Sequence, residues 1–147
     1  MQTKRRLPVL QTPAEADPDE PARPPWQWVG FGSVGIFVVW VPLSWGVTAL
    51  VSRLGGLDEA PVARALLFGG SLAVAALSGG YLVGRWGTRE VGVREAALAG
   101  FAAALIATML AWGAAGLSPG ALVTVVFGVP PAALGGRLGM KRRSGAW

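Results

Sequence analysis

The stretch from Ala96 to Gly136 reads AALAGFAAALIATMLAWGAAGLSPGALVTVVFGVPPAALGG, forty-one residues without one Asp, Glu, Lys or Arg. This length exceeds that of one ordinary buried helix. The glycines and the Ser-Pro pair between Gly113 and Gly120 predict a tight turn near its middle. Each flanking segment approaches the roughly 20 residues that a helix needs to cross a ~30 Å hydrocarbon core. The stretch therefore predicts a membrane-spanning helical hairpin.

The composition of the whole chain agrees with a membrane protein. Of its 147 residues, 52% are hydrophobic and 14% are charged, whereas about 25% are charged in a typical soluble domain. The formal charge of +5 could indicate a nucleic-acid binder. A nucleic-acid binder carries its basic residues on a folded polar face, but here they flank apolar runs. We expect no nucleic-acid partner.

The sequence contains no cysteine and no histidine. A disulfide framework, an iron–sulfur cluster and a thiol nucleophile are therefore excluded. Histidine metal sites and the usual Ser-His or Cys-His catalysis are excluded as well. We expect a protein that is not an enzyme, with no catalytic residues, no metal site and no cofactor.

Two further charge-free intervals precede the hairpin. Twenty-nine residues separate Arg23 from Arg53, and twenty more run from Ala65 to Gly84. The sequence therefore predicts an all-α, integral membrane four-helix bundle within residues 26–140. The predicted spans are approximately 28–51, 65–84, 96–115 and 119–138.

The two ends of the chain differ from this region. Residues 1–25 are rich in proline, with a basic start and an acidic middle, and cannot bury enough apolar surface to fold alone. We expect a disordered cytoplasmic tail there. Residues 141–147 form a basic C-terminus, which we also place in the cytoplasm.

Prolines interrupt two of the predicted spans. Pro42 removes one backbone hydrogen bond from the first span, and Ser44 or a neighbouring helix could satisfy the freed carbonyl. Pro130 and Pro131 should bend the fourth span. We interpret these kinks as bends of packed helices rather than as a gate.

Small residues recur every four positions in the last three spans. Such rows let helix backbones approach closely, because association in lipid depends on packing rather than on expulsion of water. The sequence does not say which row faces inward and which is left for association. The predicted helix-packing residues are Gly79, Gly80, Gly84, Gly100, Ala104, Gly128, Ala132 and Gly136.

The basic residues predict the orientation. Eleven Lys and Arg residues lie on one side of the predicted topology and two, Arg53 and Arg64, on the other. The positive-inside rule then places both termini in the cytoplasm, which requires an even number of spans. The basic residues expected to contact lipid headgroups or an acidic partner are Arg85, Arg89, Arg94, Lys141, Arg142 and Arg143. The alternative is that they only fix topology.

Polar groups within the spans are hydroxyls. Such hydroxyls usually bond to a carbonyl of their own helix or of a neighbouring one, so we assign them to packing rather than to substrate contact. They are Ser33, Ser44, Thr48, Ser71, Ser78, Thr108 and Thr124.

The ends of the second and fourth spans resemble each other. Gly79-Gly80-Tyr81-Leu82-Val83-Gly84-Arg85 compares with Gly135-Gly136-Arg137-Leu138-Gly139. Duplication of a helical hairpin would explain the likeness, and so would chance similarity between glycine-rich helix ends.

The segment from Gly79 to Arg85, together with Arg94-Glu95-Ala96-Ala97-Leu98-Ala99-Gly100, resembles a family of small four-helix bacterial membrane proteins with glycine-rich helices. The resemblance covers about the last two-thirds of the chain. It implies a location in the bacterial cytoplasmic membrane and no established activity.

Two functional hypotheses follow. The first is a non-enzymatic scaffold, assembly or regulatory subunit that packs against other membrane subunits, or against itself, through its small-residue faces. It predicts that enlarging Gly80 or Gly128 to Leu removes the partner. The alternative is a small homo-oligomeric permease or channel, bent around a central path at Pro42, Pro130 and Pro131.

Overall fold

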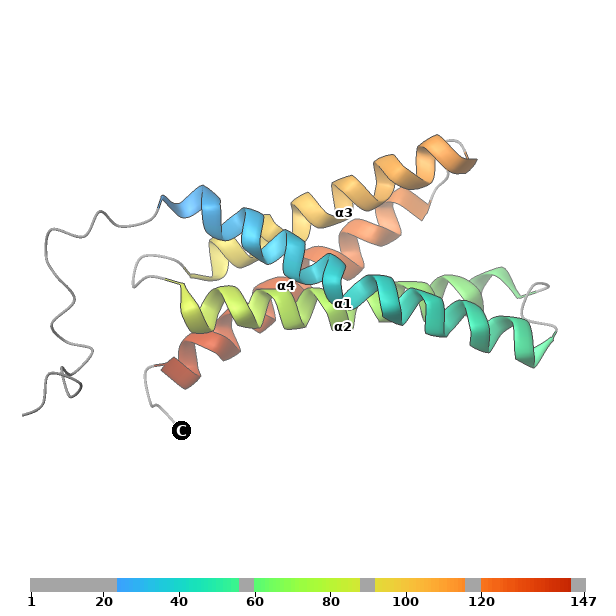
Figure 1. Cartoon of the computed structure of the whole chain (residues 1–147), viewed down its shortest axis with the longest axis horizontal. Coiled ribbons are helices and arrows are strands. Elements are labelled where there is room, and N and C mark those ends of the chain that lie inside the picture. The colour runs from blue at the N-terminus through green and yellow to red at the C-terminus, as the bar shows by residue number, and fades with distance from the viewer. Residues whose placement is uncertain (1–23, 56–59, 88–91, 116–119, 144–147) are drawn as a thin grey trace, which may run out of the picture.

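A computed structural model describes residues 24–55, 60–87, 92–115 and 120–143, with side chains described except at Pro61 and residues 111–123. Its elements are all helices: α1 (Pro25–Leu54), α2 (Pro61–Trp86), α3 (Val93–Ala115) and α4 (Gly120–Arg143) (Figure 1). The all-α prediction with four helices is confirmed. The predicted disordered tail up to residue 23, the Ser-Pro turn at 118–119 and the last four residues lie outside the described residues.

Three of the four helices are long and apolar enough to cross a membrane: Pro25–Leu54, Val62–Trp86 and Val93–Leu110. The sequence predicts four such spans. Over its described residues α4 is not among the three. A multi-pass membrane protein is indicated, and the fourth crossing stays a prediction.

Local signals explain where the helices begin and end. Both α1 and α2 start with proline, whose missing N–H costs nothing in a first turn. At the start of α3, the N–H of Gly92 donates to the Glu95 carboxylate at 2.7 Å, which is one half of a capping box. At the end of α2, the N–H of Gly87 donates to the Val83 carbonyl at 2.8 Å.

The second helix is the centre of the arrangement. It packs against all three others, and its contact with α4 is the most extensive. Along that contact the paired residue numbers rise together, so α2 and α4 run parallel. Within the described residues, α1 and α4 are not neighbours.

The bundle is packed at one end and divided at the other. Toward the end where α1 and α3 begin, α2 contacts all three other helices, while α1 and α4 stay apart. Beyond the crossing of the helices, the α1–α2 pair diverges from the α3–α4 pair (Figure 1). We call the first part the closed half: residues 25–36, 75–86, 93–104 and 128–143. The remainder of the four helices, residues 37–54, 61–74, 105–115 and 120–127, is the open half.

Most of the core lies in the closed half or at its border. One cluster joins Ile36 of α1 with Leu72, Ala75 and Ala76 of α2, and continues into Ala103 of α3 and Ala132 of α4. A second joins Val83 and Ala96 beneath Trp28. By contrast, the described buried residues of the open half are Val51, Gly69, Ser71, Leu72 and Ala107.

The helices continue through their prolines. Pro42 lies inside α1, and Pro130 and Pro131 lie inside α4. The Ser44 hydroxyl donates to the Val41 carbonyl at 2.8 Å, so it does not satisfy the carbonyl four residues before Pro42, as the sequence suggested it could. The kinks themselves stay predictions.

Candidate functional site

Four glycines form the contact between α2 and α4, which we call the α2–α4 seam. They are Gly80 and Gly84 on α2, and Gly135 and Gly139 on α4. A Cβ added to any of the four would overlap a backbone carbonyl oxygen of the other helix. The overlapped oxygens belong to Ala132 for Gly80, Gly136 for Gly84, Leu77 for Gly135 and Tyr81 for Gly139.

The seam is reciprocal. Each overlapped carbonyl belongs to a residue three positions before a seam glycine on the partner helix. The two G-x-x-x-G segments are therefore related by a local two-fold axis in which Gly80 corresponds to Gly135. This register differs by one residue from an alignment that superimposes the two Gly-Gly pairs. The seam is a close backbone approach of the kind that small residues permit between packed helices.

The same α4 helix presents another row of small residues to α3. A Cβ on Gly136 would lie 2.6 Å from the Cβ of Ala96, and a Cβ on Gly100 would lie 2.6 Å from that of Ala132. Further along, a Cβ on Gly128 would lie 3.2 Å from that of Ala104. These contacts place α4 in the groove between α2 and α3.

The third small-residue contact brings α1 into the bundle. A Cβ on Gly32 would lie 2.6 Å from a Val83 methyl and 2.7 Å from the Cβ of Ala99. Next to it, the buried Ser33 hydroxyl lies 3.1 Å from the Ala99 carbonyl and 2.9 Å from the Val29 carbonyl of its own helix. This is a polar link between α1 and α3 beside a close approach.

All eight residues that the sequence singles out for helix packing are buried. They lie against other helices of the same chain, so these rows are used inside the monomer. Sequence reasoning omitted Gly32, Gly135 and Gly139, although the four-residue spacing of the last two is the same signal. The eight are Gly79, Gly80, Gly84, Gly100, Ala104, Gly128, Ala132 and Gly136.

Hydroxyls of the predicted spans bond within the protein. Thr108 of α3 and Thr124 of α4 share a hydrogen bond of 2.9 Å between their hydroxyls. The others donate to carbonyls of their own helix, and Ser33 also reaches Ala99. These intrahelical bonds are made by Ser33, Ser44, Thr48, Ser71 and Ser78.

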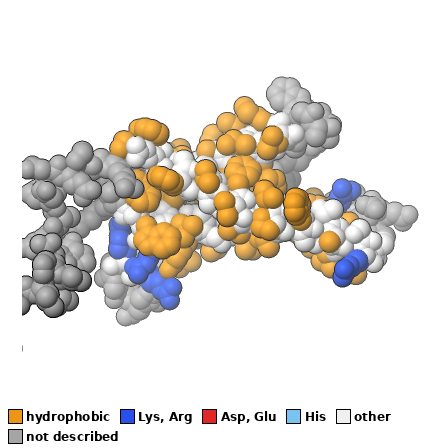
Figure 2. All heavy atoms as spheres, viewed as in Figure 1, with side chains coloured by type: hydrophobic (Ala, Val, Ile, Leu, Met, Phe, Trp, Pro, Cys, Tyr) orange, Lys and Arg blue, Asp and Glu red, His pale blue; other side chains and the backbone are white. Residues whose placement is uncertain are grey.

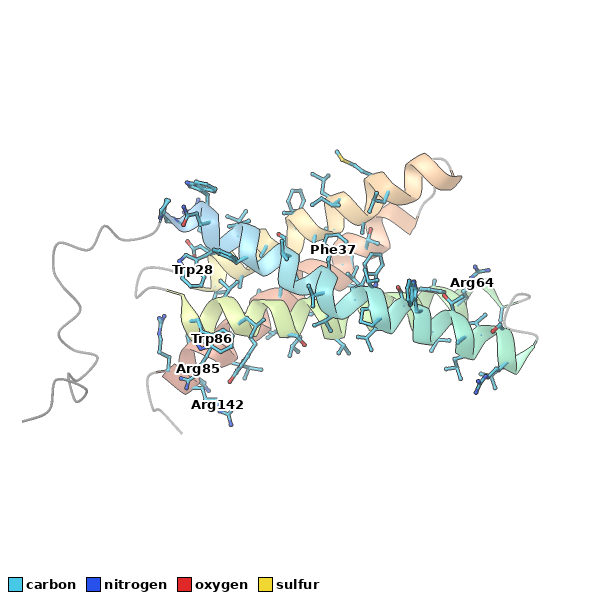
Figure 3. The ribbon with its side chains drawn as sticks, in the orientation of Figure 1. Trp28, Phe37, Arg64, Arg85, Trp86 and Arg142 are labelled. Carbon is cyan, nitrogen blue, oxygen red and sulfur yellow. The ribbon has the colours of Figure 1, made fainter. Side chains whose placement is uncertain are left out.

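Basic side chains join the ends of α2 and α4. Arg142 donates to the Tyr81 hydroxyl at 3.1 Å, and Arg85 donates to the Arg142 carbonyl at 3.4 Å. Figure 3 shows both arginines at this end, beside Trp86. The Tyr81 hydrogen bond raises the pKa of Arg142 above its ordinary value.

The remaining predicted headgroup residues differ in position. Arg143 donates to the Gly87 carbonyl across the same junction. Lys141 and Arg94 are exposed, Arg94 at the start of α3. Arg89 lies outside the described residues. Among the described residues Glu95 is the one acid, and its carboxylate caps α3.

The outer surface is apolar between basic ends. Figure 2 shows Lys and Arg side chains gathered at the two ends of the viewed face, with hydrophobic side chains over its middle. Among the three helices that could cross a membrane, α1 is the least covered by protein. In its most hydrophobic stretch of 18 residues 11% of the residues are buried, against 44% in α2. In its open half Trp45 is 75% exposed.

Comparisons with protein-family models, curated proteins and solved structures give no match to this chain. The resemblance to small glycine-rich bacterial membrane proteins therefore stays a hypothesis.

Proposed function

We propose that the protein is a non-enzymatic, multi-pass subunit of the bacterial cytoplasmic membrane, with both termini in the cytoplasm. In this proposal it scaffolds, assembles or regulates a larger membrane complex. One observation carries the proposal: the small-residue faces are buried inside the monomer, while the open half of α1 is left as an apolar surface with little protein cover.

Membrane insertion is supported by the distribution of exposed side chains. Val38 and Leu110 are 68% and 64% exposed, and Val126 is 63% exposed. These residues belong to three different helices. Contiguous apolar surface of this extent is unfavourable in water, whereas lipid tails cover it at no cost. Basic residues at both ends fit the headgroup layers.

A partner surface on α1 is supported by its small residues. Gly46 and Ala49 are exposed and lie three residues apart on one face, and an added Cβ on Gly46 would meet nothing within 4 Å. Interfaces between spanning helices are enriched in such residues. The open half of α1 thus offers a partner helix a close approach that the monomer does not use.

Burial inside the monomer changes what the Gly80 and Gly128 variants test. Gly80 and Gly128 both approach carbonyl oxygens of the same chain. Enlarging either one therefore tests the fold of the monomer rather than association with a partner. The test of association belongs on α1.

The experiment is a pull-down of the tagged full-length protein from its native membrane in mild detergent, followed by mass-resolved sizing. We expect a defined hetero-complex. The variant Gly46→Leu should lose the partner and keep the monomer folded. The matched control is Gly30→Leu, on the same helix in the closed half, where an added Cβ also meets nothing within 4 Å. Equal retention of the partner by both variants contradicts a docking surface at Gly46.

A pure homo-oligomer in the same experiment would favour the alternative, a small permease or channel. Liposome flux would then test it directly. The hydroxyls weigh against this alternative, since Ser44 donates to the Val41 carbonyl and Thr124 shares a hydrogen bond with Thr108. They are engaged in bonds within the bundle.

A further inference from the structure

A groove of about 390 Å³ lies between α2 and α4. Leu77 of α2 forms one wall, and Leu134, Arg137, Leu138 and Lys141 of α4 form the other. The α4 residues form two pairs spaced four apart, Leu134 with Leu138 and Arg137 with Lys141, so they share one face of the helix. The groove therefore runs along α4 from Leu134 to Lys141, with Arg137 and Leu138 adjacent between them.

The α2–α4 seam explains why the groove exists. Gly135 and Gly139 bring the two backbones together, and Leu134 and Leu138 precede them by one residue each. Their side chains consequently stand at the edge of the seam rather than in it, and they are 54% and 42% exposed. The groove is thus open to the surroundings and lies beside the close contact of the two backbones.

We propose that this groove binds one anionic phospholipid. An acyl chain lies against Leu77, Leu134 and Leu138, and the phosphate contacts Arg137 and Lys141. The inference deepens the proposed function, because it depends on insertion in a membrane. A planar guanidinium matches phosphate with two parallel hydrogen bonds, and an ammonium adds a second positive charge.

Charge around the groove favours an anion. Arg142 and Arg85 lie at the same end of the molecule (Figure 3). The one acid among the described residues, Glu95, is hydrogen-bonded to the backbone at the start of α3. A lipid with a net negative headgroup is therefore preferred to a zwitterionic one, whose ammonium would meet these cations.

The shape of the groove favours a lipid over a protein helix. A partner helix packs closely where small residues expose the backbone, but the small residues beside this groove are already in contact within the chain: Gly135 with Leu77 and Gly139 with Tyr81. What remains is two exposed leucine side chains, Leu134 and Leu138, with Arg137 between them in the sequence and Lys141 beyond them. The leucines suit one acyl chain, and the two cations suit its phosphate.

The test uses the purified full-length protein, delipidated in detergent and titrated with phosphatidylglycerol or phosphatidylcholine under native mass spectrometry. We expect phosphatidylglycerol to bind about tenfold more tightly. The double variant Arg137→Gln with Lys141→Gln should lose that preference. The matched control, Arg53→Gln with Arg64→Gln, removes the same charge at the other end of the molecule and should keep it.

A second variant tests the groove without changing charge. Leu138→Trp places an indole over the apolar wall at an exposed position, and we expect it to lower phosphatidylglycerol binding about tenfold. Glycerol phosphate, which has the headgroup chemistry without the chains, should not displace the lipid. Displacement by glycerol phosphate would assign the site to a free phosphate and overturn the lipid proposal.

Equal binding of the two lipids, or equal loss of preference in the groove variant and its matched control, would also overturn the proposal. These failures are distinguishable from failure of the proposed function. A protein that fractionates with membranes and retains its partner, yet binds the two lipids equally, lacks only the lipid site. A protein found in the soluble fraction removes the basis of both proposals.

Discussion

The closed and open halves of the bundle are built from the same helices but from different residues. In the closed half, glycines such as Gly84 and Gly136 bring helix backbones into contact, and a local two-fold axis relates the α2 and α4 segments of the seam. In the open half, α1 exposes Trp45 and Leu50, 75% and 45% accessible, and its pair with α2 diverges from the α3–α4 pair (Figure 1).

This difference shows how a small, highly apolar chain distributes its packing. In lipid, an apolar side chain gains little by moving from lipid to protein, so close backbone approach decides where helices hold together. Large apolar residues are then as favourable facing lipid as facing protein. The small residues hold the helices of the monomer together, and the remaining apolar surface is available to lipid or to a partner.

The largest expected effect comes from filling the seam. Gly80→Leu would place a side chain into the Ala132 carbonyl, and we expect unfolding free energy to fall by about 3 kcal/mol or more. Gly46→Leu, in open space on α1, should change it by less than about 0.5 kcal/mol. Thermal unfolding in bicelles, monitored by circular dichroism, measures both. Comparable losses in the two variants would remove the distinction between the halves.

A smaller loss of unfolding free energy is expected in the open half, where Phe127 of α4 packs against Gly69 of α2. An added Cβ on Gly69 would lie 2.8 Å from the Phe127 ring, which can rotate away as a carbonyl cannot. We expect Gly69→Ala to cost about 1 kcal/mol, and less in a Phe127→Leu background. A double-mutant cycle of unfolding free energies measures the coupling; additive costs would mean that the ring does not set the helix separation there.

Removing the hydrogen bond between α1 and α3 should lower the unfolding free energy by a smaller amount. Ser33→Ala removes a hydroxyl that reaches the Ala99 carbonyl of the neighbouring helix, at an expected cost of about 0.6 kcal/mol. Ser78→Ala is the matched control, because the described hydrogen bond of that hydroxyl stays within α2, to Val74. Equal costs would show that the interhelical bond adds nothing to the closed half.

The smallest effect concerns the start of α3. Glu95→Ala removes the carboxylate that accepts the N–H of Gly92, and we expect a loss of about 0.5 kcal/mol. Hydrogen exchange of the amides in the first turn of α3 should increase while exchange in the rest of the helix is unchanged. Increased exchange along all of α3 would mean that Glu95 supports more than the cap.

Much of this architecture could be predicted from the sequence. Charge-free intervals locate all four helices, because a spanning helix excludes ionised side chains over a fixed length. The observed helices α1 and α2 run beyond the predicted spans, beginning at Pro25 and Pro61, since a proline that opens a helix says nothing about where hydrocarbon begins. Four-residue spacing identified small residues that lie at helix contacts.

The register between the helices, and the helix that each small residue contacts, could not be predicted. Gly79 and Gly80 are adjacent in sequence, yet Gly79 approaches Ile36 of α1 and Gly80 approaches Ala132 of α4. Spacing defines rows on a helix but not which neighbour meets each row. The groove beside Arg137 depends on that same register, so sequence alone gave the basic residue without its leucine wall.

The most direct test of the asymmetry measures helix separation at both ends of the bundle. The chain has no cysteine, so spin labels can be placed at exposed sites: Trp26 with Arg94 in the closed half, and Ser52 with Met109 in the open half. Both pairs join α1 to α3. In nanodiscs, double electron–electron resonance should give a short separation for the first pair and a clearly longer one for the second. Equal separations at the two ends would contradict the account.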